Sequence, residues 1–163
     1  MTEADRVVFR RALPADLPTV VRLFAIPDEG NLKDEDPTEP LEACYQDALA
    51  RIADDPNNKL MVAELDGHVV GAFHLTIIQY VAYRGGRVAQ IENVIVEPAL
   101  RGRGIGEAMM RHAIDDARRS ECFRVQLTSN ERRTRAHRFY ERLGFVSSHR
   151  GMKLPLRDGG PRP

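Results

Sequence analysis

The chain has 163 residues, of which 42% are apolar and 29% charged, so it fits one globular domain of ordinary composition. Its longest uncharged apolar stretch, near residues 69–83, is too short to span a bilayer, and no charged and then apolar leader follows Met1, so we expect a cytoplasmic protein without a membrane partner. Residues 1–100 hold 9 Lys and Arg against 17 Asp and Glu, whereas residues 101–163 hold 15 against 7. This split indicates an anion site on one side and a cation-friendly surface on the other, or two solvated faces that attract each other.

The first part of the chain predicts one strand and two helices. Residues 7–10 read as a short strand, and apolar residues recur at helical spacing from Pro14 to Phe24 and again from Leu41 to Asp54. Residues 28–42 hold seven acids and a single lysine. The sequence therefore predicts two early helices joined by an acidic loop.

The middle of the chain changes to the period of strands. Residues 59–65 and 68–83 flank an Asp66-Gly67 pair, and a turn with two glycines separates the second run from residues 88–96. Asp-Gly between apolar runs is a strong short-range signal for a hairpin. We therefore expect three antiparallel strands in a meander.

The last third alternates helices and strands. A helical apolar stripe covers residues 106–117, residues 124–129 read as a strand, and a helix over residues 136–143 is stopped by Gly144. The segments FVSSH and MKLPL, within residues 145–156, could pair as a closing hairpin.

These elements give the order βααβββαβαββ. This order predicts an α/β fold in which a mixed, mostly antiparallel sheet of about seven strands is flanked by about four helices. We expect residues 1–163 to form a single domain with flexible ends at residues 1–5 and 157–163.

Three glycines stand at alternate positions where the strand 88–96 leads to the next helix, in the run VIVEPALRGRGIGEAMM. Glycine weakens such a junction unless something must approach the backbone closely. Free amides and the positive end of the helix dipole attract an anion, with a pyrophosphate as the natural guest. The absence of Cβ atoms at Gly102 and Gly104 would let phosphate oxygens reach the amides, and Gly106 would let the helix lie close to the sheet. Arg101 and Arg103 add positive charge.

Two well-known phosphate-binding motifs fit these glycines less well. A P-loop requires a Gly-Lys-Ser/Thr ending, and no such lysine is present. The dinucleotide fingerprint requires G-x-G-x-x-G inside a parallel βαβ unit, whereas here the spacing is G-x-G-x-G after a meander. A merely flexible turn accounts for one glycine and not for three.

The run IVEPALRGRGIGEAMM resembles the acetyl-CoA motif of the GNAT (Gcn5-related N-acetyltransferase) superfamily, Arg/Gln-x-x-Gly-x-Gly/Ala, filled by Arg101, Gly104 and Gly106. The later run AHRFYERLGF resembles the second signature of this family. The resemblance implies that amides from Gly102 to Gly106 hold the pyrophosphate of acetyl-CoA, and that the backbone of Val94 and Val96 pairs with the pantetheine arm like an added strand.

Carried over in full, the resemblance implies a cosubstrate site with these members: Val94, Ile95, Val96, Arg101, Gly102, Arg103, Gly104, Ile105, Gly106, Glu107, Asn130 and Arg133. Many relatives have an Asn about seven residues before the tyrosine of the second signature. Here Asn130 lies ten residues before Tyr140, and Arg133 occupies the nearer place.

Acetyl transfer to an amine requires a neutral amine, a polarised carbonyl and a proton for the leaving thiolate. An alkyl amine with a pKa of about 10.4 is almost entirely protonated at pH 7, so a general base or a desolvating site must assist. Glu92 is the acid on the strand that leads to the cosubstrate motif, and it is our candidate for the base or for the group that anchors the amine. The alternative is a carboxylate on the face of the sheet, paired with a nearby Arg.

Tyr140 stands where the family has the tyrosine that protonates the sulfur, so the resemblance implies that it is the acid. By periodicity alone Tyr140 would be a core residue, because it shares an apolar stripe with Ala136, Phe139 and Leu143. A backbone N–H of the strand at residues 94–96 would polarise the carbonyl. None of the five histidines has the spacing of a metal site, and we predict no metal.

The acceptor is predicted by two hints that disagree. The acids of residues 28–42 favour a cationic amine, because a negatively lined mouth concentrates cations. The run IENVIVEPALRGRGIG, however, is similar to that of glucosamine-phosphate and aminoalkylphosphonate acetyltransferases, whose acceptors are anionic. We therefore expect the acceptor to be a primary amine of a small molecule or peptide, and its net charge is left open.

Two rival functions remain. A nucleic-acid-binding module would use the basic half with its arginine-rich segment 132–142, but it leaves the three glycines unexplained and offers no interleaved exposed aromatic residues. A CoA-binding sensor that no longer catalyses would be favoured by loss of Tyr140, which is present. We expect an acyltransferase without a nucleic-acid partner, and a homodimer, since exposed sheet edges often serve dimers in this family.

Overall fold

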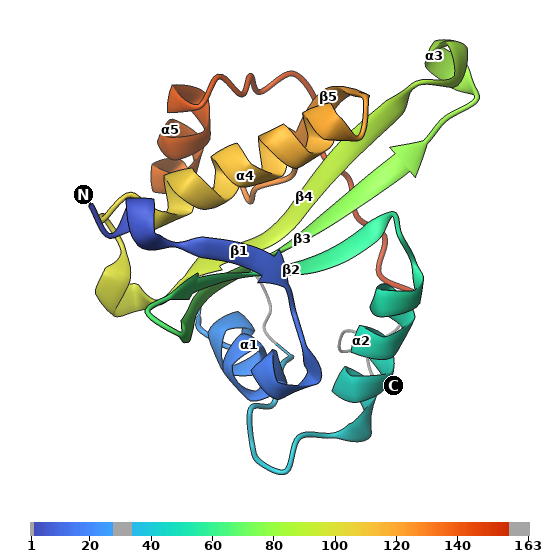
Figure 1. Ribbon diagram of the computed structural model, residues 1–163. Coiled ribbons are helices and arrows are strands. Elements are labelled where there is room, and N and C mark those ends of the chain that lie inside the picture. The colour runs from blue at the N-terminus through green and yellow to red at the C-terminus, as the bar shows by residue number, and fades with distance from the viewer. Residues whose placement is uncertain (1, 28–33, 157–163) are drawn as a thin grey trace.

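The computed structural model describes residues 2–27 and 34–156 (Figure 1). It contains one sheet in the order β1-β2-β3-β4-β5. The strands are β1 (Val8–Arg11), β2 (Asn58–Leu65), β3 (His68–Gln79), β4 (Arg87–Val96) and β5 (Cys122–Leu127). Neighbouring strands from β1 to β4 are antiparallel, and β4 and β5 are parallel. The expected meander around the Asp66-Gly67 turn is confirmed.

Helices cover both faces of this sheet. In Figure 1, α1 (Leu17–Phe24) and α2 (Ala43–Asp54) lie on one face, and α4 (Ile105–Arg119) and α5 (Thr134–Arg142) lie on the other. The tip of the β3–β4 hairpin is the short α3 (Ala82–Gly85), in which two residues adopt left-handed conformations. The single-turn 3-10 elements are η1 (Ala4–Arg6), η2 (Pro14–Asp16) and η3 (Pro98–Leu100). The layered α/β class is confirmed.

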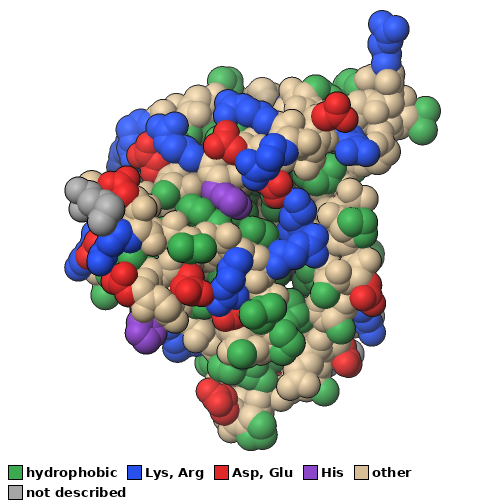
Figure 2. Space-filling view, viewed as in Figure 1, with side chains coloured by type: hydrophobic (Ala, Val, Ile, Leu, Met, Phe, Trp, Pro, Cys, Tyr) green, Lys and Arg blue, Asp and Glu red, His purple; other side chains and the backbone are tan. Residues whose placement is uncertain are grey.

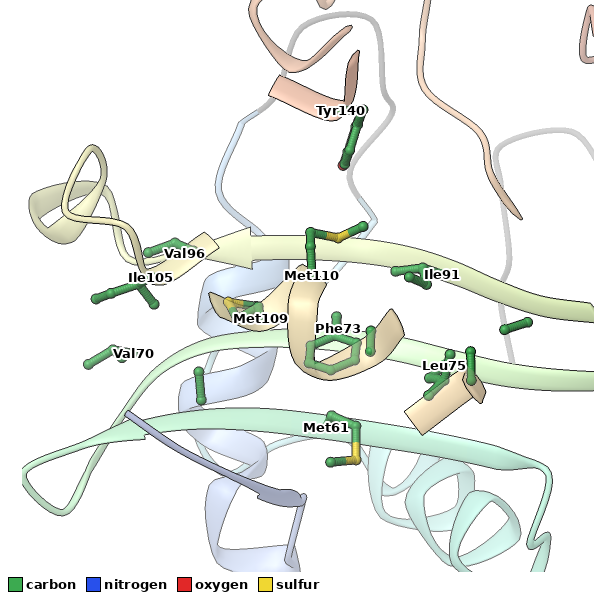
Figure 3. Close-up of a cluster of buried hydrophobic side chains, with 14 of the residues drawn as sticks. Met61, Val70, Phe73, Leu75, Ile91, Val96, Ile105, Met109, Met110 and Tyr140 are labelled. Atoms are coloured by element: carbon green, nitrogen blue, oxygen red, sulfur yellow. The ribbon is translucent and has the colours of Figure 1, made fainter. Parts of the chain in front are cut away.

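Alternate residues along the strands feed two hydrophobic cores. Phe73 and Leu75 of β3 pack with Met109 and Met110 of α4 in the core on the α4 face (Figure 3). Ala72, which points to the opposite face of β3, packs in the smaller core under α1 and α2. Because successive side chains of a strand point to opposite faces of the sheet, each strand residue packs under one helix layer. It therefore also lies on one side of the site. The described helices include none that is both long and apolar enough to cross a membrane.

The expected closing hairpin is wrong. Residues 145–156 form no strand, and five strands are present in the described residues instead of about seven. A two-stranded hairpin is marginal unless one face packs on a core. Here Phe145 packs on the core of the α4 face, whereas the other large apolar side chains are 82–91% exposed: Val146, Met152, Leu154 and Leu156.

The ends of the chain are described only in part. Met1, residues 157–163 and residues 28–33 of the acidic loop lie outside the described residues. Within the end that we expected to be flexible, Thr2 donates two hydrogen bonds to the Asp5 carboxylate, and residues from Ala4 onward form η1. The N-terminal segment therefore adopts a defined turn.

Candidate active site

The sheet opens along β4. Pairing between β4 and β5 ends at Ile91 and Leu127, whereas pairing between β3 and β4 continues to Gly71 and Val96. On the side away from β3, no described strand therefore pairs with the last five residues of β4, from Glu92 onward. Such an unpaired edge inside a sheet can accept an extended ligand through main-chain hydrogen bonds.

A β-bulge shapes this free stretch. Ala72 lies opposite Ile95 and His74 lies opposite Glu92, so two residues of β4 face the single intervening residue of β3. Asn93 takes a left-handed conformation with φ 53° within this bulge. A bulge bends its strand and redirects side chains. As a result Val94 packs on the core of the α4 face, and Ile95 packs on the core of the α1 face.

The segment after β4 presents a row of amides. Gly102 has φ 78° and Gly104 has φ 83°, a left-handed region where other residues are strained. Gly104 is the N-cap residue of α4 and has no side chain to cap the helix. No described residue accepts a hydrogen bond from the amides of Gly102 to Glu107, so these donors and the positive end of α4 suit a diphosphate.

The two arginines of this segment have different partners. The Nε of Arg101 donates a hydrogen bond of 3.1 Å to the carbonyl of Val96, which ties the segment to β4. Arg103 instead forms an ion pair of 2.8 Å with Glu3. Glu107 forms an ion pair of 2.6 Å with Arg111 on the exposed side of α4.

One expectation about the glycines is wrong. A Cβ added at Gly106 would lie 3.7 Å from Cγ2 of Val96 and 3.8 Å from Cζ of Phe139, which are ordinary contacts. The helix therefore does not need glycine at this position in order to lie close to the sheet. Gly102 and Gly104 are required for a different reason, their left-handed backbone.

Tyr140 is a member of the core, as its periodicity indicates. Its side chain is buried at 9% exposure, and its ring packs against the rings of Phe139 and Phe145 with centroid distances of 5.2 and 5.9 Å. Figure 3 shows the ring pointing from α5 toward β4 and Met110. Because the ring of Tyr140 is packed on both neighbours, its phenol has little freedom to rotate away from β4.

Glu92 lies on the opposite face of β4. It is exposed, and no ion pair joins it to an arginine in the described parts of the chain, so the expected alternative of a structural pair is not found. Its cross-strand neighbour is His74, whose ring stacks on Phe24 of α1 at 5.9 Å between centroids. Burial lowers the pKa of His74, so the imidazole is neutral near pH 7.

The turn between β5 and α5 contains the other two predicted residues. The Asn130 side-chain oxygen accepts a hydrogen bond of 3.0 Å from the amide of Arg132, and its carbonyl accepts one of 3.0 Å from the amide of Arg133. Arg133 is the N-cap residue of α5. Both residues shape this turn, and a role for either with the cosubstrate stays a prediction.

An open hollow lies beside α1, on the same face as Glu92. It has a volume of about 310 Å³ and is lined by Pro18, Thr19, Arg22, Pro37 and Glu39. Arg22 also forms an ion pair of 2.7 Å with Glu97, which follows β4 directly. Within residues 2–27 and 34–156, no cluster of His, Cys, Asp or Glu is arranged to hold a metal ion.

An opened sheet with an amide-lined turn at its helix start has the two features that a CoA-dependent acyltransferase needs. The sequence profile described as the acetyltransferase (GNAT) family matches residues 26–145, and the chain therefore belongs to this family and is an acyltransferase. Members of the family take acetyl-CoA as cosubstrate, and the free amides from Gly102 to Glu107 fit its diphosphate.

Two curated relatives are N-acetyltransferases by name, and a solved structure shares the fold. The chain is 38% identical over 114 residues to the glucosamine 6-phosphate N-acetyltransferase of Trypanosoma brucei brucei, covering 66% of this chain and 75% of that protein. It is 32% identical to the aminoalkylphosphonate N-acetyltransferase of Salmonella typhimurium, covering 64% and 68%. The crystal structure of a transcriptional regulator from Bacillus halodurans C-125 matches with a TM-score of 0.87 at 38% identity, over 92% of this chain and 99% of that one.

Proposed function

We propose that this protein transfers the acetyl group of acetyl-CoA to the primary amine of a small molecule by direct attack. The observation that carries the proposal is the parting of β4 from β5 directly before the amide-lined turn. In this arrangement the amides from Gly102 to Glu107 bind the diphosphate, and the free edge at Val94 and Val96 pairs with the pantetheine arm. The thioester is thereby brought to the opening, beside Glu92.

The two proton transfers are assigned to opposite faces of the sheet. Glu92, on the α1 face, takes a proton from the ammonium of the acceptor, directly or through a water. The neutral amine then forms the new C–N bond at the carbonyl that a backbone N–H of residues 94–96 polarises, and the C–S bond breaks. Tyr140, on the α4 face, gives its phenolic proton to the departing sulfur, and the second proton that the attacking nitrogen loses on becoming an amide restores the phenol through solvent. Acetyl-CoA supplies only the acyl group and the leaving thiolate.

We assign the acceptor to amines that also carry a phosphate or phosphonate group. Both named curated relatives act on amines of this kind. The hollow beside α1 brings a cation and an acid together, Arg22 and Glu39. Glu97 contacts one guanidinium nitrogen of Arg22, whose side chain is 50% exposed, so the hollow still offers a partner to each charge of such a zwitterion. This class also reconciles the acidic residues 34–42 with an anionic substituent on the acceptor.

The experiment is a panel of amines scored by release of free thiol from acetyl-CoA. The panel contains glucosamine 6-phosphate, an aminoalkylphosphonate, their dephosphorylated counterparts, a polyamine and a lysine peptide. We expect turnover with the phosphorylated amines and at least tenfold less with the counterparts that lack the anion. Turnover of the polyamine or the peptide alone would overturn the acceptor class, and no thiol release with any amine would overturn the transferase proposal.

A nucleic-acid-binding function predicts a different result. Figure 2 shows acidic and basic side chains side by side over α4, and the ion pairs Glu107–Arg111 and Asp115–Arg118 account for part of this mixture. A face of mixed sign binds the phosphate backbone weakly. A rise in melting temperature with duplex DNA and none with acetyl-CoA would favour the nucleic-acid module.

A further inference from the structure

The N-terminal turn packs on the diphosphate turn. Oε1 of Glu3 lies 2.8 Å from a guanidinium nitrogen of Arg103, although the two residues are one hundred positions apart in the chain. Cβ of Ala4 lies 3.3 Å from the place where a Cβ on Gly104 would be. The carboxylate of Glu3 therefore lies beside Arg103, a cation of the site proposed for the diphosphate.

The ion pair between Glu3 and Arg103 is made through a single contact. The second carboxylate oxygen, Oε2, is buried and has no hydrogen-bond partner among the described residues. The Arg103 side chain is 50% exposed. Arg10 differs, because it contacts both oxygens of Asp16 and also Glu64. A single-contact, half-exposed pair contributes little stability, so a stronger anion can replace it.

Arg101 cannot take the place of Arg103. Its Nε is engaged by the Val96 carbonyl, so its first role is to hold the turn against β4. Arg103 stands between the two left-handed glycines, next to the free amides, and its present partner is a side chain that a ligand can replace.

We propose that Glu3 is an exchangeable counter-ion for Arg103. In the free chain Glu3 neutralises Arg103, and the diphosphate of acetyl-CoA or CoA takes over Arg103 when it binds. The free energy needed to break the Glu3–Arg103 pair is then subtracted from the binding free energy of the ligand, which favours release of CoA. This positioning role rests on the proposed function, since it assumes that the amides from Gly102 to Glu107 bind the diphosphate.

The test is a double-mutant cycle read by calorimetric binding of CoA. Glu3→Gln keeps the shape of the side chain and removes its charge, so we expect the dissociation constants of CoA and acetyl-CoA to fall by about three- to tenfold alike, because the diphosphate is common to both. Arg103→Gln should weaken binding. In the Arg103→Gln background, Glu3→Gln should change the dissociation constant less than twofold.

The matched control is Asp115→Asn, which removes a carboxylate paired with Arg118 farther along α4 and should leave binding unchanged. Melting temperatures of all variants show whether the fold is retained. Equal CoA affinity of wild type and Glu3→Gln, or a gain that persists without Arg103, would overturn the exchange while leaving the proposed function in place. A wild-type chain that binds no CoA would overturn the proposed function and the exchange with it.

Discussion

At the scale of single residues, the two catalytic candidates are separated by the sheet. Tyr140 belongs to the core of the α4 face, and Glu92 is exposed on the α1 face. Glu92 was chosen from the sequence because it is the acid on the strand before the glycines, and its role as base stays a prediction. The spacing of Tyr140 predicted a core residue, which is confirmed, whereas its role as acid rests on the family signature and stays a prediction.

Replacement of Tyr140 by Phe should lower kcat by about 10²–10³-fold, because a positioned acid contributes a factor of this order. The ring and its packing on Phe139 and Phe145 are retained, so the melting temperature and the CoA dissociation constant should stay near wild type. Steady-state kinetics and calorimetry measure both. Tyr83→Phe, at the exposed hairpin tip, is the control. Full activity of the Tyr140→Phe enzyme would exclude this phenol as the acid.

Replacement of Glu92 by Gln should lower kcat/KM by about 10²-fold at pH 7, and the deficit should shrink as pH rises toward the pKa of the acceptor amine. At high pH the amine is already neutral, so a base is needed less. A pH profile of kcat/KM for both enzymes measures this. Glu121→Gln, in the turn before β5, is the control. A deficit that is constant from pH 7 to 9.5 would point to an amine anchor instead of a base.

At the scale of elements, the order of helices and strands could be predicted, and the details that build the site could not. The Asp66-Gly67 turn fixed one hairpin, but no turn of two residues fixed the register between β3 and β4, so the pairing of His74 with Glu92 was missed. The bulge at Asn93 was missed as well, because residues 94–96 are apolar at every position, so the shift in alternation that a bulge causes leaves no trace in the sequence. The closing hairpin failed because its apolar residues have no core to cover.

The diphosphate turn gives a prediction at this scale. Gly104→Glu places a side chain at φ 83° and a negative charge among the free amides, so we expect a loss of about 1–2 kcal/mol in stability from backbone strain. We also expect acetyl-CoA to raise the melting temperature of this variant by less than 1 °C, against several degrees for wild type. Thermal denaturation with and without the cosubstrate measures both effects.

Gly67→Glu provides the matched control. Gly67 has φ 80°, so this variant suffers similar strain at a hairpin far from the amides. It should melt lower than wild type yet keep the full rise with acetyl-CoA. Should Gly104→Glu keep that rise, the assignment of the amides to the diphosphate would be wrong.

At the scale of the whole molecule, the half-buried imidazole of His74 makes the stability of the fold depend on pH. His74 lies between Leu60 of β2 and Glu92 of β4 and against Phe24 of α1, and burial lowers its pKa below 6.5. Between the two pKa values, His74 is protonated in the unfolded chain and neutral in the folded chain. Stability is therefore present above about pH 6.5 and is lost as pH falls from there toward the lowered pKa.

The corresponding variant is His74→Gln. We expect its melting temperature to fall less than that of wild type between pH 7.5 and 5.5, and each unit by which the pKa is lowered corresponds to about 1.4 kcal/mol at the acid end. His68→Gln, at an exposed position after the hairpin turn, should keep the wild-type slope. Parallel slopes for His74→Gln and wild type would refute the role of His74.

The exposed segment 145–156 gives a second prediction for the whole molecule. Met152, Leu154 and Leu156 are each more than 80% exposed, and an apolar group of this kind indicates an interface. We expect a homodimer of twice 18.4 kDa, and a monomer when Leu154 and Leu156 are both replaced by Asp. Light scattering after gel filtration measures the mass, and Val81→Asp, at an equally exposed site on the hairpin tip, is the control. A monomeric wild type would contradict the expectation.

The position of β4 between the two helix layers has a consequence for how this enzyme can change. In the proposed function, the diphosphate and the pantetheine arm of acetyl-CoA bind to β4, the turn after it and the start of α4, whereas the acceptor binds beside α1 on the other face of the sheet. Exchange of residues 17–54 for the corresponding part of a relative should therefore alter which amine is modified and leave donor affinity intact. The acceptor specificity can then change without any change in the residues assigned to acetyl-CoA.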